Sequence, residues 1–493
     1  MAVRTGLRSA CGKGVRPCLS MPAFWLMSVA LLAGLAGCAS VEERQAFLNL
    51  KIEAGAFAGE ADASAAGMIP ELGEDATLSD YTAYALLRNP GLEAAFNDWK
   101  AGLERVSQAR SLPDPRFTYV HYVEAVETRV GPQERSFALM QTFPWLGKLQ
   151  RQGDIAFKEA EAARQRYEAA RLRLIYQLKL AYYEYYYLWR AISVMETDIK
   201  LVSNLEGIAR TKYEVGTVPY STLIKAQVEM GKLEETLATL MDLEDPTVAR
   251  LNKTLGRPPD AYLARPTSLD TEPITSSDDD ILAELKRNNP ELLALDLIVS
   301  KEEASIGLVR QGYFPDITLG ATVVRTGDAL NPQLEDSGKD PVMATVSLNL
   351  PIWIGKHRAA GREARARLHA TAKRREDHEN QLLSDLKLAL FGFRSAERKI
   401  DLYGDSLIPK AEQALTASRK AFSADKADFF DLIEAQRTLL EFQLAHERAL
   451  ADRAERLAEI EMLIGRQVRP EQSVGPGVGM DSPAPPEAES EPE

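Results

Sequence analysis

Two colinear copies of one pattern make up most of this chain, and this duplication constrains the fold more than any other feature. The matched motifs are Asn89-Pro90 with Asn289-Pro290, Pro113-Asp114 with Pro315-Asp316, PWLGK (144–148) with PIWIGK (351–356), LIKAQ (223–227) with LIEAQ (432–436), and LGR (255–257) with IGR (464–466). The separation between partners rises from 200 to 209 residues without falling back. A repeat of this length is a duplicated structural unit, so we expect both copies to share one architecture.

The first 37 residues have the pattern of a secretory signal peptide. Four basic residues precede an apolar run from Phe24 to Leu35, and small residues follow the run. This order is typical of a leader that is removed from the mature chain. The run is too short to span a bilayer as a helix, so we interpret residues 1–37 as a signal peptide.

Cys38 follows Leu35-Ala36-Gly37, and this pattern resembles the bacterial lipobox, whose cysteine is acylated and becomes the first mature residue. The other two cysteines lie in the leader, which leaves Cys38 without a disulfide partner in an oxidising compartment. The alternative is an ordinary cleavage site with a chance cysteine. We therefore predict a lipid anchor, including palmitate, on Cys38. Because Ala39 is not the Asp associated with inner-membrane retention, we expect this anchor to lie in the outer membrane.

The charge of the chain argues against a nucleic-acid partner. The formal net charge is -13, and removal of the four basic residues of the leader leaves the mature chain at -17. Nucleic-acid binding needs a basic face, and none is evident. After the leader, no stretch is apolar enough for a membrane-spanning helix, so any crossing of a membrane must use strands.

The pattern within each copy predicts helix, two strands, and a long helical hairpin. In the first copy we expect helix over 77–111 with an interruption at Asn89-Pro90-Gly91, strands over 116–124 and 135–143, and helices over 148–214 and 220–255 with a kink at Pro246. The stretch 148–214 contains no proline, which allows a helix of roughly 100 Å at about 1.5 Å per residue.

In the second copy we expect helices over 281–310, 356–423 and 427–464, strands over 317–324 and 342–350, and a kink at Pro409. The strand pattern alternates, with Val342, Ala344, Val346, Leu348 and Leu350 on one face and polar residues on the other. Together with Trp145 and Trp353 beside the strands, this pattern indicates a transmembrane β-barrel. The alternative is a small soluble β-domain at the end of a coiled-coil rod.

Four strands per chain are too few for a barrel, and a sheet edge left open in lipid is not tolerated. A barrel must therefore be shared between copies. Two chains would supply about eight strands, whose interior side chains largely fill the barrel. Three chains would supply about twelve and could enclose a lumen that the long helices extend as a tube.

The duplicated motifs, read in order behind a lipobox, resemble the TolC-like outer-membrane efflux ducts from about Leu78 to Arg466. The resemblance implies a mainly α fold with a small transmembrane β part: internally duplicated α-helical hairpins, four β-strands per chain, a trimeric twelve-stranded barrel and a periplasmic helical tunnel. The segment FPWLGKLQ is most similar to the branch that serves heavy-metal and related pumps of the resistance-nodulation-division class.

Asp431 and Glu434 are the candidate pore constriction. They lie three residues apart and hence on one helical face, at the place where the resemblance implies an acidic pair lining the constriction. A trimer would place six carboxylates there as a cation-attracting filter. The alternative is a solvated acidic helix start that the helix dipole stabilises. This chain departs from the family pattern with Glu434 in place of Asp and with Ala427 in place of a basic residue.

The equivalent positions of the first copy are Thr222 and Lys225. Lys225 either pairs with a carboxylate across the tip or faces water. The resemblance also implies that the two turns bind a periplasmic adaptor, and the residues concerned are Gly216, Thr217, Asp425 and Lys426. We find no cluster of catalytic or metal-ligating residues, since the five histidines show no ligand spacing, and we predict no enzyme activity and no cofactor.

The resulting organisation is a signal peptide (1–37), a lipid-anchored tether (38–77), a first repeat (78–257), a linker (258–280), a second repeat (281–466) and a disordered tail (467–493). The expected function is a passive outer-membrane exit duct of a tripartite efflux system, with a homotrimer, an adaptor, an inner-membrane pump and outer-membrane lipid as partners. The alternative is a lipid-anchored periplasmic rod or adaptor without a pore. Metal ions, organic toxins and peptides all remain open as cargo.

Overall fold

The computed structural model of the chain describes residues 45, 48–49, 72–269, 273–331 and 333–466. The predicted signal peptide, Cys38 and the predicted tail lie outside the described residues. The chain divides into two compact units, a strand-rich unit that includes 108–153 and 314–351, and a helical unit that includes 154–313 and 352–466. Each unit combines segments from both sequence copies, so neither copy is a separate domain.

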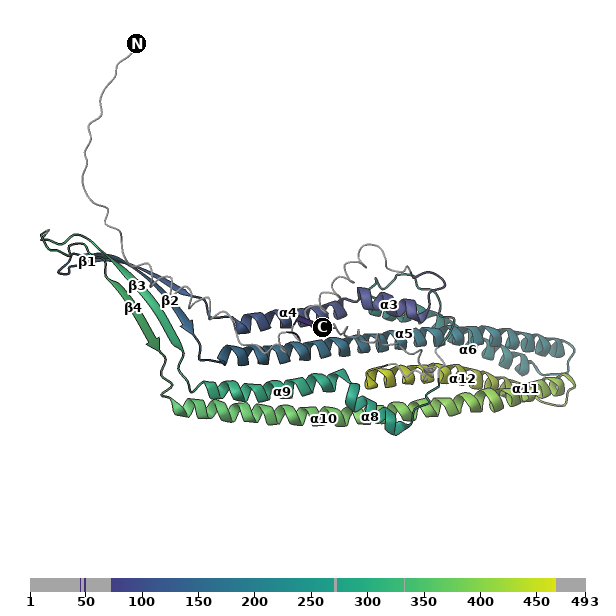
Figure 1. The fold of residues 1–493 in the computed structure, drawn as a ribbon. Helices are drawn as coiled ribbons and strands as arrows, with labels where there is room; N and C mark the ends of the chain where they lie inside the picture. Colours follow the sequence, from purple (N-terminus) through teal and green to yellow (C-terminus); the bar gives the residue numbers. More distant parts are fainter. Residues whose placement is uncertain (1–44, 46–47, 50–71, 270–272, 332, 467–493) are drawn as a thin grey trace, which may run out of the picture. The chain divides into compact units, whose positions relative to one another are not determined.

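The strand-rich unit is a single antiparallel sheet. Its strands are β1 (Arg116–Val126), β2 (Gln133–Phe143), β3 (Ile317–Thr326) and β4 (Val342–Leu348), in the order β1-β2-β3-β4 (Figure 1). The predicted four strands are confirmed. The central pair, β2 with β3, joins the first copy to the second, and its register runs from Phe143 opposite Ile317 to Gln133 opposite Thr326. Strands β1 and β4 are the two edges.

One face of the sheet is apolar, as the alternation predicts. Phe117 lies opposite Leu139, Leu139 opposite Ala321, and Ala321 opposite Ala344, so these four side chains form one row on a common face. Phe117 and Leu139 keep 65% and 55% of their surface exposed within a single copy. A row of apolar side chains that crosses every strand is the arrangement expected of a sheet that faces lipid.

A carboxylate at the strand ends connects the two copies inside the strand-rich unit. Asp316, directly before β3, accepts hydrogen bonds from the Trp145 backbone N–H at 2.9 Å and from Lys148 Nζ at 3.1 Å. Trp145 stacks on Phe314, with ring centroids 4.9 Å apart and an interplanar angle of 12°. The repeated Pro-Asp motif of one copy thus binds the repeated Pro-Trp motif of the other.

The helical unit contains long hairpins from both copies. Their elements are α3 (Leu78–Arg88), α4 (Pro90–Arg110), α5 (Lys148–Glu214), α6 (Tyr220–Asp242) and α7 (Glu244–Leu255), then α8 (Asp278–Asn288), α9 (Pro290–Gln311), α10 (Ile354–Asp401), the π-helix η1 (Leu402–Leu407), α11 (Ile408–Ser423) and α12 (Phe429–Ile464). Across the described ranges, none of the helices is both long and apolar enough to cross a bilayer.

Prolines interrupt the helices by removing a backbone donor. The kink predicted at Pro246 is present, since the helix predicted over 220–255 ends at Asp242 and restarts at Glu244, where Pro246 has no N–H for the Asp242 carbonyl. The single helix predicted over 281–310 is two helices that meet at Asn289-Pro290. Pro409 interrupts the long helix of the second copy as predicted, in the form of the π-helical turn η1 directly before it.

The Asn-Pro motif of the first copy connects three helix ends. The Asn89 side chain accepts hydrogen bonds from the Gly91 and Leu92 N–H groups at 2.9 and 3.1 Å, which caps α4. Its Nδ2 donates to the Thr254 carbonyl at the end of α7, at 2.9 Å. Gly256 follows in a left-handed conformation, and a Cβ there would lie 2.6 Å from the Arg88 carbonyl oxygen. The LGR and NP motifs therefore form one packed junction.

The second copy contains the same junction. Asn289 caps α9 through the Glu291 and Leu292 N–H groups at 2.9 and 3.1 Å, and donates to the Leu463 carbonyl at 2.9 Å. Gly465 is left-handed with φ of 79°, and a Cβ there would lie 2.6 Å from the Asn288 carbonyl oxygen. The Asn-Pro motif contacts the LGR or IGR motif in the same way in both copies, which explains why the sequence repeats both motifs.

Apolar clusters hold the hairpins together. One joins α8, α10 and α12 through residues such as Leu285, Leu386, Phe393 and Ile460. Another surrounds the tips, where Leu205 on α5 and Ala226 on α6 meet Phe422, Phe429 and Leu432 of the second copy. The tips of the two copies are therefore packed against each other within the helical unit.

Candidate functional site

The candidate tip residues lie at the two hairpin turns, α5–α6 in the first copy and α11–α12 in the second (Figure 1). Gly216 and Asp425 occupy the same left-handed backbone conformation, with φ of 78° and 56°. The next residue closes each turn, since Thr217 N–H donates to the Lys212 carbonyl and Lys426 N–H to the Ala421 carbonyl. The two turns thus share one backbone geometry with different side chains.

All four predicted docking residues, Gly216, Thr217, Asp425 and Lys426, are exposed. Exposure makes these turns available to a partner. Their role in docking stays a prediction.

Lys212 connects the two tips. Its Nζ donates to Asp425 Oδ1 at 2.5 Å and to the Ser423 carbonyl at 3.3 Å, and it lies 5.3 Å from the centre of the Phe422 ring. All three partners belong to the second copy. The position equivalent to Lys212 in the second copy is Ala421. Alanine has no side-chain donor, so the second copy cannot make the equivalent contact with the first.

The predicted constriction residues lie in the first two turns of α12. Asp431 and Glu434 are both exposed, whereas the neighbouring Leu432 and Ile433 point into the tip core. Glu434 lies 4.0 Å from Arg437, and its side chain is 58% exposed. The structure brings the two carboxylates onto one exposed helical face. Their lining of a constriction depends on other copies of the chain and stays a prediction.

The first copy differs at the equivalent positions. Thr222 is buried, whereas Lys225 is exposed. Among the described residues no carboxylate lies within ion-pair distance of Lys225 in a single copy. Of the two alternatives for Lys225, the single copy therefore shows the solvent-facing one.

A cluster of buried polar side chains joins α5, α6 and α12, and it was not predicted from the sequence. Asp198 on α5 and Glu229 on α6 are each 5% exposed, and Gln436 on α12 is fully buried. Gln436 Nε2 donates to Asp198 Oδ2 at 2.5 Å. Arg437 Nε donates to Glu229 Oε1 at 2.8 Å, and a second contact makes the pair bidentate. A clue in the sequence is the helical spacing of Gln436 from Leu432, which places an amide on an apolar stripe.

The surroundings of this cluster raise the pKa of one carboxyl group and lower the pKa of another. Burial raises the pKa of Asp198 to about 6, the hydrogen bond from Gln436 opposes the increase, and the Glu229 carboxylate adds to it. The hydrogen bond from Arg437 holds the pKa of Glu229 below its ordinary value. Gln436 Oε1 is buried without a hydrogen-bond partner among the described residues, so this cluster is polar but incompletely satisfied.

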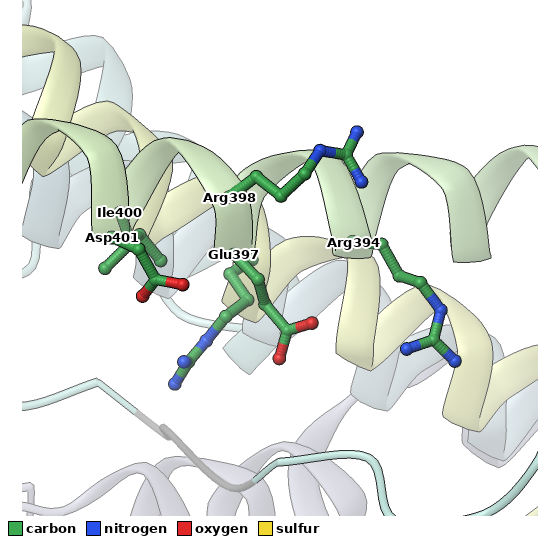
Figure 2. A pocket seen from close by; sticks show the side chains of 6 residues that line it. Arg394, Glu397, Arg398, Ile400 and Asp401 are labelled. Carbon is green, nitrogen blue, oxygen red and sulfur yellow. The ribbon is translucent and has the colours of Figure 1, made fainter.

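One groove of the helical unit is lined almost entirely by charged side chains. This open groove of about 390 Å³ lies along α10 and is lined by Arg394, Glu397, Arg398, Ile400, Asp401 and Arg453. Figure 2 shows the side chains of this groove from close by. The groove contains no cysteine, serine or histidine. Across the described ranges, no group of three or more His, Cys, Asp or Glu residues is placed to hold a metal ion.

Comparisons with known proteins agree with the fold and with the family resemblance. A family model described as "Outer membrane efflux protein" matches residues 83–257 and 281–466. The chain is 21% identical to Nodulation protein T of Rhizobium leguminosarum bv. trifolii over 415 residues, which cover 81% of this chain and 88% of that protein.

It is also 24% identical to the cobalt-zinc-cadmium resistance protein CzcC of Cupriavidus metallidurans over 246 residues, which cover 49% of this chain and 56% of that protein. The structure is similar to the outer membrane protein VceC of Vibrio cholerae, with a TM-score of 0.66, 18% identity, and coverage of 80% of this chain and 97% of VceC.

Proposed function

This chain belongs to the outer membrane efflux protein family, and from that premise we propose that three copies form the exit duct of a tripartite efflux system. As a member of this family, the chain is an outer-membrane efflux channel. In the proposed assembly the sheets of three copies close a shared barrel, and the helical units enclose a periplasmic tunnel. An inner-membrane pump supplies the energy and a periplasmic adaptor contacts the tips.

The observation that supports the trimer best is the sheet. Its apolar face carries exposed side chains on every strand, and both edges, β1 and β4, are open. An open edge is costly in lipid because its N–H and C=O groups have no water to bind. The alternative function, a lipid-anchored rod without a pore, has no need for such a face.

Oligomeric state and conductance test this proposal directly. Purified full-length protein in detergent should have the mass of a trimer by native mass spectrometry. Reconstituted in planar bilayers, it should give discrete single-channel currents. A monomer that inserts into bilayers, or a trimer that conducts no current, would contradict the exit-duct function.

We propose in addition that Cys38 carries the lipid anchor, on the sequence pattern of its surroundings. Intact-mass measurement of the mature protein should find acyl chains on an N-terminal Cys38. The Cys38→Ser variant should retain the leader and lack the acyl chains. An unmodified N-terminus in the wild-type protein would contradict the anchor.

A further inference from the structure

The start of α10 has a basic stripe that the fold itself does not explain. Arg358, Arg362, Arg365 and His369 follow one another at intervals of four, three and four residues, so they lie along one side of the helix. All four side chains are exposed. Across the residues that the structure describes, none of the three arginines lies within ion-pair distance of a carboxylate. The glutamate beside them in sequence, Glu363, pairs with Arg367 at 2.6 Å.

This basic stripe is present in the second copy only. The equivalent helix of the first copy is α5, at a separation of 208 residues, since Lys148 matches Lys356. The residues of α5 that correspond to the stripe are Gln150, Asp154, Phe157 and Glu161, and none of them is basic. The helix therefore folds without such a stripe. Like charges three or four residues apart also destabilise a helix, so the stripe costs stability and needs another explanation.

The basic stripe lies on the same side of α10 as α8. Arg365 and Arg394 are 29 residues apart, which is about eight helical turns, so they point to one side of the helix. Arg394 donates to Asp278 of α8 at 2.6 Å, and Lys286 of α8 pairs with Glu379 of α10 at 3.0 Å. Helix α8 is therefore a second layer on this side. A second layer inside a tube of hairpins would fill its lumen, so the stripe faces outward.

Exposed apolar residues come directly before the stripe. Ile352, Trp353 and Ile354 keep 66%, 73% and 52% of their surface exposed. Trp353 follows Leu348, the last residue of β4, by five positions in the chain. A tryptophan next to apolar residues at the end of a membrane strand is typical of the interface between the membrane and water. The helix thus begins at the membrane surface.

The first turns of α10 are within reach of lipid headgroups. The helix begins at Ile354, and at about 1.5 Å per residue Arg358, Arg362 and Arg365 lie at most roughly 6, 12 and 17 Å farther along its axis. The polar layer of one leaflet is about 5–8 Å thick. Arginine side chains extend their charged ends toward such a layer, so the three guanidinium groups can approach it together.

We propose that Arg358, Arg362 and Arg365 bind the phosphate groups of anionic phospholipids in the membrane leaflet that faces the periplasm. A guanidinium group can donate two parallel hydrogen bonds to a phosphate. An anionic membrane surface attracts arginine within about 8 Å at physiological ionic strength. The inference rests on the outer-membrane location of the channel and does not depend on the number of copies.

Charge complementarity is the reason to assign an anionic lipid. The mature chain has a predicted net charge of -17, so its surface as a whole repels an anionic membrane. Binding then requires a local concentration of positive charge. On the side of the stripe, the first carboxylate after Arg358 is Glu376, which pairs with Lys373 at 2.5 Å. The stripe is therefore free of negative charge over its whole length.

Native mass spectrometry of the full-length protein, purified in detergent and delipidated, tests this site. The probes are dioleoylphosphatidylglycerol, which is anionic, and dioleoylphosphatidylethanolamine, which has the same acyl chains and no net charge. The wild-type protein should bind the anionic lipid about ten-fold more tightly, since each arginine near the surface contributes to attraction. The preference should weaken when the ionic strength rises, because salt screens it.

The decisive variant combines Arg358→Gln, Arg362→Gln and Arg365→Gln, and it should lose most of the preference. Its melting temperature should equal or exceed that of the wild type, because the repulsion along the helix is removed. Unfolding then cannot explain the loss. The corresponding triple Arg→Lys variant keeps the charges and should keep most of the preference.

A matched control removes the same number of charges elsewhere on α10. Lys387→Gln, Arg398→Gln and Lys399→Gln change exposed residues much farther along the helix, and this variant should keep the preference. If the control loses it as the stripe variant does, net charge controls lipid binding and the site is refuted. A stripe variant that keeps the preference, or a wild type without one, would also overturn the proposal.

Two further arms separate the lipid from other anions. Soluble glycerophosphoglycerol should compete poorly, because it has the headgroup without the membrane; competition equal to that of the lipid would show a site for free phosphate and overturn the proposal. Binding to purified peptidoglycan that the stripe variant loses, without any lipid preference in the wild type, would assign the stripe to the cell wall instead.

The same spectra report the number of copies, so the site and the exit duct are judged separately. A monomer that prefers the anionic lipid through the stripe would keep the site and contradict the trimer. A trimer without the preference would keep the duct and overturn the site.

Discussion

The Asn-Pro junctions and the hairpin tips are both present twice in the helical unit, but only the junctions have the same chemistry in both copies. Asn89 and Asn289 donate to the carbonyl of a neighbouring helix end at the same distance, 2.9 Å. At the tips, Gly216 corresponds to Asp425, and a buried Thr222 corresponds to an exposed Asp431. The duplication therefore preserved one site and changed the other.

The difference follows from what each site contacts. At the junctions the side chains bind backbone groups, which are identical in both copies, so an asparagine makes the same hydrogen bonds in each copy. At the tips the side chains contact other side chains across the two copies. Lys212 reaches Asp425, and Arg437 reaches Glu229. Such contacts require different partners in each copy, which explains why the tip residues diverge.

The largest expected effect is on the junction glycines. Gly256→Ala and Gly465→Ala each place a side chain in a left-handed conformation, at about 1–2 kcal/mol, and 2.6 Å from a backbone carbonyl oxygen. The backbone must move, at about another 1–3 kcal/mol. Each variant should lose roughly 3 kcal/mol of unfolding free energy, and the two losses should agree within about 1 kcal/mol. Thermal or denaturant unfolding of the full chain measures both.

Two helical glycines serve as controls for the same substitution. Gly207 on α5 and Gly231 on α6 have nothing within 4 Å of an added Cβ. Replacement with Ala at these positions should raise the stability by up to about 1 kcal/mol through helix propensity. If the four variants melt alike, the junctions are not constrained as the comparison requires.

A smaller effect, of opposite sign, is expected at Asp198. Burial raises its pKa from the ordinary value of 3.8 to about 6, so the folded state at neutral pH contains an unfavourable buried charge. Asp198→Asn removes this charge, and its amide can donate to Gln436 Oε1. At about 1.4 kcal/mol per pKa unit, the variant should gain on the order of 2–3 kcal/mol of unfolding free energy at pH 7.5.

The pH dependence separates the charge from other effects of this substitution. Between about pH 4 and pH 6 the folded state binds a proton at Asp198 that the unfolded state does not, so wild-type stability falls as the pH rises through this window. The advantage of Asp198→Asn should therefore disappear near pH 4. Melting temperatures of both proteins at pH 4 and 7.5 provide the measurement, and an unchanged difference would exclude the buried charge as its cause.

Much of the fold was predictable because its signals are local. The absence of proline from Lys148 to Glu214 predicts α5 with its observed ends, and alternation predicts the two faces of the sheet. The pairing within the buried cluster was not predictable, since Asp198 and Gln436 are 238 residues apart in sequence. Likewise, Asp425 is a non-glycine residue in a left-handed turn whose contact with Lys212 appears only in three dimensions.

A third test compares the junctions with each other. Asn89→Asp and Asn289→Asp keep the oxygen that caps the following helix but replace the Nδ2 donor by an acceptor that faces a carbonyl. Asn289 is 3% exposed, whereas Asn89 is half-buried. Because an unsatisfied buried group costs about 1–3 kcal/mol, Asn289→Asp should lose about 2 kcal/mol and Asn89→Asp about 1. Equal losses would show that burial does not distinguish the two junctions.

The smallest expected effect in energy concerns the tips. If Asp431 and Glu434 line a constriction, replacing both with Ala removes six carboxylates from a trimer. Cation selectivity should fall several-fold, which corresponds to about 1 kcal/mol, and block by divalent cations should weaken. Single-channel recordings in planar bilayers measure both. Stability should change little, because both side chains are exposed.

The choice of control decides what this last experiment can show. Glu455 and Glu459 lie on the same helix, but both are ion-paired, with Arg448 at 3.1 Å and Arg456 at 2.6 Å, and burial raises the pKa of Glu455 to about 7. Replacing them would disturb packing as well as charge. Glu93 and Asp98 on α4 are exposed and match the pair in charge and residue type. If Glu93→Ala with Asp98→Ala changes selectivity as much as the tip pair does, the carboxylates act through net charge, and the difference between the tips has no role in conduction.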